Sequence, residues 1–290
     1  MNDYVLLTDS SADLTDALVK ELGVEVLPLS FTMRNKTYRN WPDNREIDPK
    51  DFYRQLREGE MATTSAVNVS DFTETIEPHL KEGRDVLVVA FSSGLSATCH
   101  SAQIAAQELS EQYPERKVYV VDSLCASLGQ GLLVWYAARM KNEGRGIGAV
   151  RDWLEENKLH LCHWFTVDDL FFLKRGGRVS AATALVGSAL GIKPVLHVDN
   201  EGHLINVSKA RGRKNSILAL VDRMERSAIG PEKQTVFISH GDCLADAEFL
   251  AQEVRRRLHV PRIEINYVGP VIGAHSGPGT LALFFLGTER

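Results

Sequence analysis

The sequence has few cysteines, and none of them stands in a pattern that builds a disulfide framework or a metal site. The four cysteines, Cys99, Cys125, Cys162 and Cys243, lie far apart and form no C-x-x-C pair. Zinc sites and redox-active thiol pairs need closely spaced ligands. The sequence also has no Walker A motif, no G-x-G-x-x-G after a strand, no H-E-x-x-H pair and no EF-hand loop. We therefore expect reduced, buried thiols, no metal and no cofactor.

Long hydrophobic runs are also missing. The most apolar stretches, residues 132–138 and 281–286, are much shorter than the roughly 20 residues that cross a bilayer. Met1 comes almost directly before the strand-like segment 4–7, without the basic region that opens a secretory signal. We expect no transmembrane segment and a cytoplasmic location.

Positive charge is not in excess. The 290 residues include 33 Lys and Arg against 38 Asp and Glu, a formal net charge of −5, so no overall field attracts nucleic acid. Basic residues gather in segments 174–178 (KRGGR) and 209–214 (KARGRK). Such clusters are usually solvated, or they dock an acidic or phosphate-bearing partner. A nucleic-acid regulator acting through 209–214 would lack the aromatic residues that stack on bases.

Alternating apolar strands and helices predict an α/β fold for the first half. Residues 5–8, 24–32, 85–91 and 117–121 have strand patterns, and helices are expected between them. Segment 85–91 is almost wholly apolar, as in a strand that is covered on both faces. These patterns favour a doubly wound, mainly parallel sheet with right-handed crossovers.

The pattern changes near residue 158. Segments 192–198 and 203–207 flank the turn 199–202 (DNEG), which predicts an antiparallel hairpin. Further strands are expected at 235–239 and 262–267, with helices near 213–227 and 244–258. We predict an α/β, Rossmann-like domain at 1–158, an α+β domain at 159–290, and a cleft between them.

Three segments have residues suited to hold an anion. In segment 92–98 (SSGLSAT) a strand becomes a helix, so amide and hydroxyl groups can face a carboxylate or phosphate, although serine capping explains the same residues. Segment 61–66 (MATTSA) is predicted as a hydroxyl-rich loop at the same sheet edge, or as a plain solvated loop. Segment 269–279 (GPVIGAHSGPG) surrounds His275 with four glycines and two prolines. A lone histidine is nevertheless more often structural than functional.

Taken together, these segments resemble the DegV family of fatty-acid-binding proteins, which includes the lipid-carrying subunit of fatty acid kinase in Gram-positive bacteria. The resemblance runs through nearly the whole chain. It rests on residues 8–14 (TDSSADL), 64–65 before 71–72, 92–98, 122–123, 174–180 (KRGGRVS) and 269–279. Each segment alone is weak, whereas the combination is specific.

The resemblance implies two α/β-type lobes that enclose a tunnel for one long-chain fatty acid. Its carboxylate would be held near the domain interface by Thr64, Ser93 and His275, with Ser65, Ser92 and Gly94 as secondary candidates. Arg178 and Arg211 match family arginines that are expected to meet the catalytic subunit of the kinase.

Two departures from the family pattern bear on loop shape and ligand preference. Ala66-Val67 stands where the family usually has Gln-Pro, and Ala97 stands for the usual glycine. Tunnel depth would depend on the packing of apolar residues, among them Phe171, Phe172, Leu185, Leu190, Phe284 and Phe285.

The energetics of a long acyl chain favour a carrier. Burying about fifteen methylenes contributes roughly 12 kcal/mol, against an association cost of roughly 4 to 15 kcal/mol. The tail therefore supplies the affinity, while hydroxyls and an imidazole N–H offset the dehydration of the carboxylate. On this hypothesis the chain is not an enzyme but presents the acid to a separate kinase, which forms an acyl phosphate.

The rival hypothesis is a hydrolase or acyl-transfer enzyme that uses Ser93 or Ser96 with His275. Its weakness is the missing acid, since only Glu264 or Asp122 is a candidate to orient the imidazole. Segment 94–98 also lacks the last glycine of a hydrolase elbow.

Overall fold

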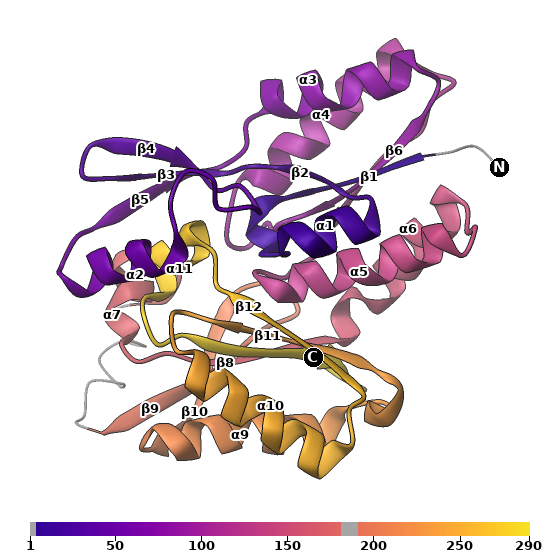
Figure 1. The fold of residues 1–290 in the computed structure, drawn as a ribbon. Helices are drawn as coiled ribbons and strands as arrows, with labels where there is room; N and C mark the ends of the chain where they lie inside the picture. The colour runs from indigo at the N-terminus through magenta and orange to yellow at the C-terminus, as the bar shows by residue number, and fades with distance from the viewer. Residues whose placement is uncertain (1–3, 181–190) are drawn as a thin grey trace.

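The computed structural model describes residues 4–180 and 191–290 (Figure 1). Two residues named for tunnel packing, Leu185 and Leu190, lie outside the described residues. The strands are β1 (Tyr4–Asp9), β2 (Glu25–Leu27), β3 (Ser30–Met33), β4 (Lys36–Arg39), β5 (Ala62–Ser65), β6 (Asp85–Ala90), β7 (Val118–Asp122), β8 (Leu161–Thr166), β9 (Ile192–Val198), β10 (Leu204–Arg211), β11 (Thr235–His240), β12 (Arg262–Tyr267) and β13 (Leu281–Leu286). The helices are α1 (Asp16–Leu22), α2 (Pro49–Arg57), α3 (Val69–Lys81), α4 (Thr98–Gln112), α5 (Leu128–Asn142), α6 (Ile147–Asn157), α7 (Leu170–Arg175), α9 (Arg213–Ser227), α10 (Leu244–Leu258) and α11 (Pro270–Ser276).

The first half forms a four-stranded parallel sheet in the order β2-β1-β6-β7, as the strand pattern predicts. Alternate residues of β6 face opposite ways: Val86 and Val88 pack in the cluster with α3 and α4, and Leu87 and Val89 in the cluster with α5. Figure 1 shows α3 and α4 on one side of this sheet and α1, α5 and α6 on the other. Both faces are therefore covered, which explains the unbroken apolar run.

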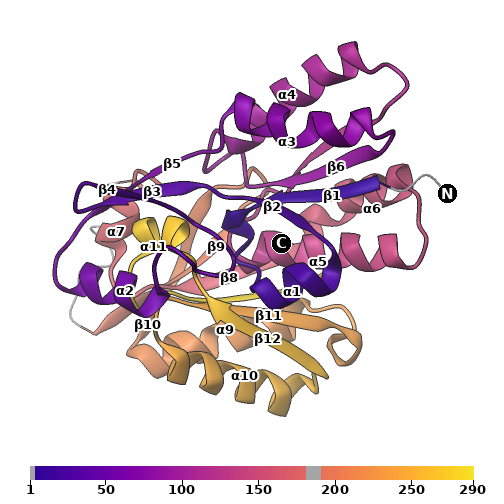
Figure 2. The ribbon, with the colours of Figure 1, turned by 45° about the horizontal axis from the view of Figure 1, so that its top comes forward.

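The second half forms a six-stranded mixed sheet in the order β10-β9-β8-β13-β11-β12. The β9–β10 hairpin is confirmed, with Val198 opposite Leu204. Helices α9 and α10 cover one face of this sheet, and α5 lies on the other, between the two large sheets (Figure 2). The predicted domain boundary at residue 158 falls between β7 and β8, yet one hydrophobic core, with Leu132 and Phe284 among its members, includes residues from both sheets.

A third sheet, in the order β4-β3-β5, corrects two expectations. The single strand predicted over 24–32 is wrong, because Pro28 separates β2 from β3 and the two strands join different sheets. The loop predicted at 61–66 is also wrong in part: β5 pairs with β3, which places Thr64 opposite Phe31. Helix α11, from the end of the chain, packs against β3, β5 and α2 and so meets this sheet.

Within residues 4–180 and 191–290, every helix is too short or too polar to cross a membrane.

Candidate functional site

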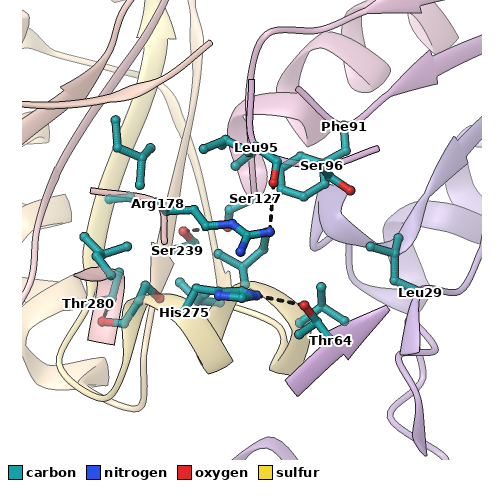
Figure 3. Close-up of a pocket in the computed structure, with 18 of the residues that line it drawn as sticks. Leu29, Thr64, Phe91, Leu95, Ser96, Ser127, Arg178, Ser239, His275 and Thr280 are labelled. Atoms are coloured by element: carbon teal, nitrogen blue, oxygen red, sulfur yellow. Dashed lines mark hydrogen bonds between the residues drawn. The ribbon is translucent and has the colours of Figure 1, made fainter. Parts of the chain in front are cut away.

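A cavity of about 270 Å³ lies among the three sheets and is lined by residues from both halves of the chain (Figure 3). Most of its wall is apolar, with Leu95, Phe165 and Val271 as examples. The polar lining consists of Thr64, Ser65, Ser96, Ser127, His163, Arg178, Ser239, His275, Ser276 and Thr280. Largely apolar cavities with a few placed polar groups are typical of small-molecule sites.

Thr64 and His275, which the resemblance implies hold one carboxylate together, lie side by side in the structure. His275 Nε2 lies 2.8 Å from Thr64 Oγ1, and this bond joins α11 to β5 (Figure 3). No described residue is a hydrogen-bond partner of His275 Nδ1, which is buried. Burial, with the positive charges of Arg178 and Arg175, lowers the pKa of His275 to about 4. The imidazole is therefore neutral at pH 7 and has a single N–H to donate.

Arg178 lies in the wall of the cavity and not on an open surface. Its guanidinium is half-buried and donates to the carbonyl oxygen of Gly176 and, over 3.0 Å, to that of Leu95. Burial lowers the pKa of Arg178, but a guanidinium stays protonated in proteins. The cavity thus has a fixed positive charge near the Thr64–His275 pair. Arg211, the other arginine expected to dock a partner, is exposed at the end of β10.

The structure does not bring Ser93 into the cavity. Its side chain is exposed outside the lining, and its amide donates to Asp122 Oδ1 over 3.2 Å. Ser92 and Gly94 instead pack against the β9–β10 turn: Ser92 Oγ donates to the carbonyl oxygen of Gly202 over 2.9 Å, and a Cβ on Gly94 would clash with that turn. Of the secondary candidates, Ser65 alone lines the cavity.

The residues expected to set tunnel depth also lie elsewhere. Phe171 is exposed, Phe284 and Phe285 are buried in the core, and Phe172 packs under Gly277. None of the four lines the cavity.

A buried polar chain that was not predicted from the sequence lies between the two large sheets, and two of its members, Ser127 and Ser239, line the cavity. Ser127 Oγ lies 2.6 Å from Asp13 Oδ2, to which it donates, and 3.0 Å from Ser239 Oγ on β11 (Figure 3). Asn266 adds a bond from its side-chain amide to the Asp13 carbonyl oxygen. Burial raises the pKa of Asp13 to about 7, and the bond from Ser127 opposes that shift. Ser127 has a left-handed backbone, with φ +54°, and no pattern in the sequence predicts this conformation.

Asp13→Asn is expected to change how stability depends on pH. Because folding raises the pKa of Asp13 from 3.8 to about 7, the folded chain holds an extra proton between these values, and stability falls as pH rises through that window. The variant has no carboxyl and loses this slope. In urea unfolding, the free energy of unfolding of the variant relative to the wild type should be about 2 to 3 kcal/mol higher at pH 8 than at pH 5. The lowered pKa of His275 makes stability rise with pH, but it does so equally in the wild type and in the variant. If the free energy of unfolding changed by the same amount between pH 5 and pH 8 in both proteins, the role of Asp13 would be contradicted.

The imidazole of His275 packs against Gly176, in the space that a side chain at position 176 would fill. A Cβ at Gly176 would lie far inside contact distance of His275 Nδ1. We therefore expect Gly176→Ala to displace the imidazole and to weaken anion binding in the cavity about tenfold, with little effect on the fold. Gly148→Ala, where a Cβ would meet open space, is the matched control. Equal ligand affinity in the two variants would contradict this assignment.

The geometry does not assemble a catalytic triad from the described residues. Ser96 Oγ pairs with Thr98 Oγ1 at 2.9 Å, and neither Ser93 nor Ser96 hydrogen-bonds His275. The two carboxylates considered as orienting acids are engaged elsewhere: Asp122 accepts backbone amides, and Glu264 pairs with Arg262. No group of three or more His, Cys, Asp or Glu side chains within the described ranges is arranged to hold a metal ion.

Comparison with known proteins assigns the chain to a family. The family model described as "Uncharacterised protein, DegV family" matches residues 4–288. The chain belongs to the DegV family. A DegV domain-containing protein of Clostridium perfringens is 49% identical over 290 residues, which cover 100% of this chain and 99% of that protein.

Solved structures of DegV proteins share the fold. A Thermus thermophilus DegV protein, described by its fatty acid binding, superimposes with a TM-score of 0.89 at 35% identity and covers 99% of this chain and 100% of its own. A Bacillus subtilis DegV, described as a fatty acid binding protein, gives a TM-score of 0.85 at 29% identity over 99% and 100% of the two chains. The resemblance seen in the sequence is thereby confirmed, as is the α/β fold with a parallel and a mixed sheet.

Proposed function

We propose that this DegV protein binds one long-chain fatty acid, with the acyl chain in the cavity and the carboxylate beside Thr64, His275 and Arg178. The observation that carries the proposal is the largely apolar cavity in which a neutral imidazole, a hydroxyl and a guanidinium lie close together. Related DegV structures described as fatty acid binding support it.

The three polar groups have complementary tasks toward a carboxylate. A buried carboxylate without partners costs several kcal/mol, and hydrogen bonds to a charged group recover roughly 1.5 to 3 kcal/mol each. If His275 Nε2–H donates to Thr64 Oγ1, the Thr64 hydroxyl is free to donate to the ligand. Arg178 then supplies the opposite charge within the cavity wall. Ser93, exposed beside this region, remains a predicted contact that the cavity lining does not include.

Calorimetric titration of delipidated protein with palmitate and with hexadecanol tests the proposal. Both ligands offer the same apolar chain, but only palmitate has an anion to meet Arg178 and the hydroxyl of Thr64. We expect one molecule of palmitate per chain, bound at least tenfold more tightly than hexadecanol. Equal affinities would show that the polar groups do not recognise a carboxylate, and no binding of either ligand would refute the proposal.

We further propose that the protein is a carrier without catalytic activity, which presents the acid to the catalytic subunit of a fatty acid kinase. The pairing of Thr64 with His275 and the lack of an orienting carboxylate among the described residues favour a carrier over a hydrolase. Phosphorylation of a carboxylate needs a nucleoside triphosphate, so the carrier and the kinase are proposed to act in the cytoplasm.

Arg211→Ala is expected to separate lipid binding from transfer. Arg211 is exposed on β10 and does not line the cavity. Arg178 lines the cavity, and we assign it both to carboxylate binding and to contact with the kinase. The Arg211 variant should therefore retain palmitate with wild-type affinity but lower the rate of acyl phosphate formation by the kinase. Exposed Lys209→Ala, on the same strand, is the control. A fall in palmitate affinity would place Arg211 in the binding site and contradict this division.

A further inference from the structure

His163 is a polar residue set in an apolar part of the cavity wall. It lies on β8, its side chain is 5% exposed, and it lines the cavity together with Phe165 and Ala282. Its ring lies 4.6 Å from the ring of Phe284 and 5.5 Å from that of Phe165, measured between centroids. No described residue is a hydrogen-bond partner of its buried Nδ1.

An unpartnered imidazole here is costly to the fold. Leaving a buried donor or acceptor without a partner costs about 1 to 3 kcal/mol, and a leucine or phenylalanine would pack in the same place without that cost. Two other polar groups in the wall are partnered within the protein: Ser127 with Asp13 and Ser239, and Thr280 with the carbonyl oxygen of Ser276. Nδ1 is enclosed by the protein, whereas Nε2 is neither enclosed nor hydrogen-bonded to a described residue. Because His163 lines the cavity, Nε2 is the ring nitrogen that a ligand group can reach.

The chemistry of the His163 ring limits which ligand group can bind it. Burial, together with Arg290 and His197, lowers the pKa of His163 well below its ordinary value, so the ring is neutral. A neutral imidazole offers one N–H and one lone pair. The aromatic neighbours disfavour a charged partner, which would be desolvated there. A hydroxyl, which both donates and accepts, fits these constraints.

Strand register gives the depth at which this hydroxyl would lie. Thr280, whose hydroxyl donates to the carbonyl oxygen of Ser276 next to His275, immediately precedes Leu281. Leu281 pairs with Thr166, whereas His163 pairs with Phe284. Four residues of strand separate the levels of Thr280 and His163, about 13 Å, which is the reach of roughly ten carbon atoms in an extended alkyl chain.

We propose that His163 is a second recognition point in the cavity, which receives a hydroxyl group near the middle of a long-chain fatty acid. This inference rests on the proposed function and names the substrate class within it: mid-chain hydroxylated fatty acids in preference to plain ones. Ser276, whose buried Oγ also lacks a described partner, lies next to His275 and so serves the carboxylate end.

Positional isomers of one hydroxylated acid test the proposal without changing the hydrophobicity of the ligand. Delipidated protein is titrated with 3-hydroxy-, 10-hydroxy- and 17-hydroxyoctadecanoate, and with plain octadecanoate and oleate. We expect the 10-hydroxy isomer to bind about tenfold more tightly than the other two isomers, because it alone reaches His163. Equal affinities of the three isomers would overturn the proposal, as would a preference for oleate over the 10-hydroxy acid.

His163→Leu and His163→Asn locate the effect at this side chain. The leucine variant should lose the preference for the 10-hydroxy isomer while keeping or improving its affinity for octadecanoate. The asparagine variant, which retains a donor and an acceptor, should keep part of the preference. Failure of octadecanoate to bind the wild type would refute the proposed function itself. Normal octadecanoate binding with no effect of position would refute only the role of His163.

Discussion

Ala282→Phe is expected to weaken fatty acid binding more than a hundredfold while leaving the protein folded. Ala282 lies on β13 with its side chain against the cavity. An aromatic ring needs a space of about 150 Å³, roughly half of the cavity of about 270 Å³. If the ring excludes four methylenes of the ligand at about 0.8 kcal/mol each, the affinity for palmitate falls more than a hundredfold.

Two measurements separate this blocked cavity from a damaged fold. Filling an apolar void adds packing contacts, so the melting temperature of the variant should equal or exceed that of delipidated wild type. Ala282→Ser, which adds little volume, should bind palmitate almost as well as wild type. A phenylalanine variant that melts normally and still binds palmitate would show that the acyl chain lies elsewhere.

His275→Ala is expected to lower palmitate affinity by ten- to a hundredfold. The variant removes the N–H donor and breaks the bond between α11 and β5, leaving Thr64 without its 2.8 Å partner. Because the pKa of His275 is about 4 in the unliganded protein, its charge does not change between pH 6 and pH 8. A ratio of wild-type to variant affinity that is constant across that range would mean that the imidazole is neutral in the complex as well.

The ligand itself supplies the control for this prediction. Hexadecanol has no carboxylate, so its affinity should fall much less than that of palmitate in the His275 variant. Thr64→Val, which keeps the shape of the side chain and removes the hydroxyl, should show the same selectivity with a smaller loss. If the alanine variant lost palmitate and hexadecanol equally, His275 would support the wall of the cavity and not the carboxylate.

Regular periodicity allowed most of the fold to be predicted from sequence. The apolar run at 85–91 predicted a strand that is covered on both faces, and the DNEG turn predicted the β9–β10 hairpin. Both predictions were possible because both signals are local in the sequence. The small third sheet was not predictable in this way. Strand β5 pairs with β3 across about thirty intervening residues, and its letters ATTS are those of a loop as much as of a strand.

The site was predictable to the extent that motifs mark special backbone. The glycine-rich surroundings of His275 pointed to that residue, and the structure brings it to Thr64. For segment 92–98 the predicted contacts differ from the structure. Ser92 and Gly94 were candidates for the carboxylate site, but they pack against the turn at Gly202, which is distant in the sequence. Ser127 and Ser239 gave no signal, since a serine at a helix start or in an apolar strand acquires its role only when two sheets meet.

Mass spectrometry of an organic extract would show whether the cavity holds a fatty acid. Protein purified without detergent from cells that make long-chain fatty acids is extracted, and the released lipid is quantified per mole of chain, beside the Ala282→Phe variant. We predict close to one fatty acid per wild-type chain and almost none in the variant. A wild-type protein that releases no fatty acid, and takes up none when palmitate is supplied, would contradict a buried acyl chain as the source of affinity.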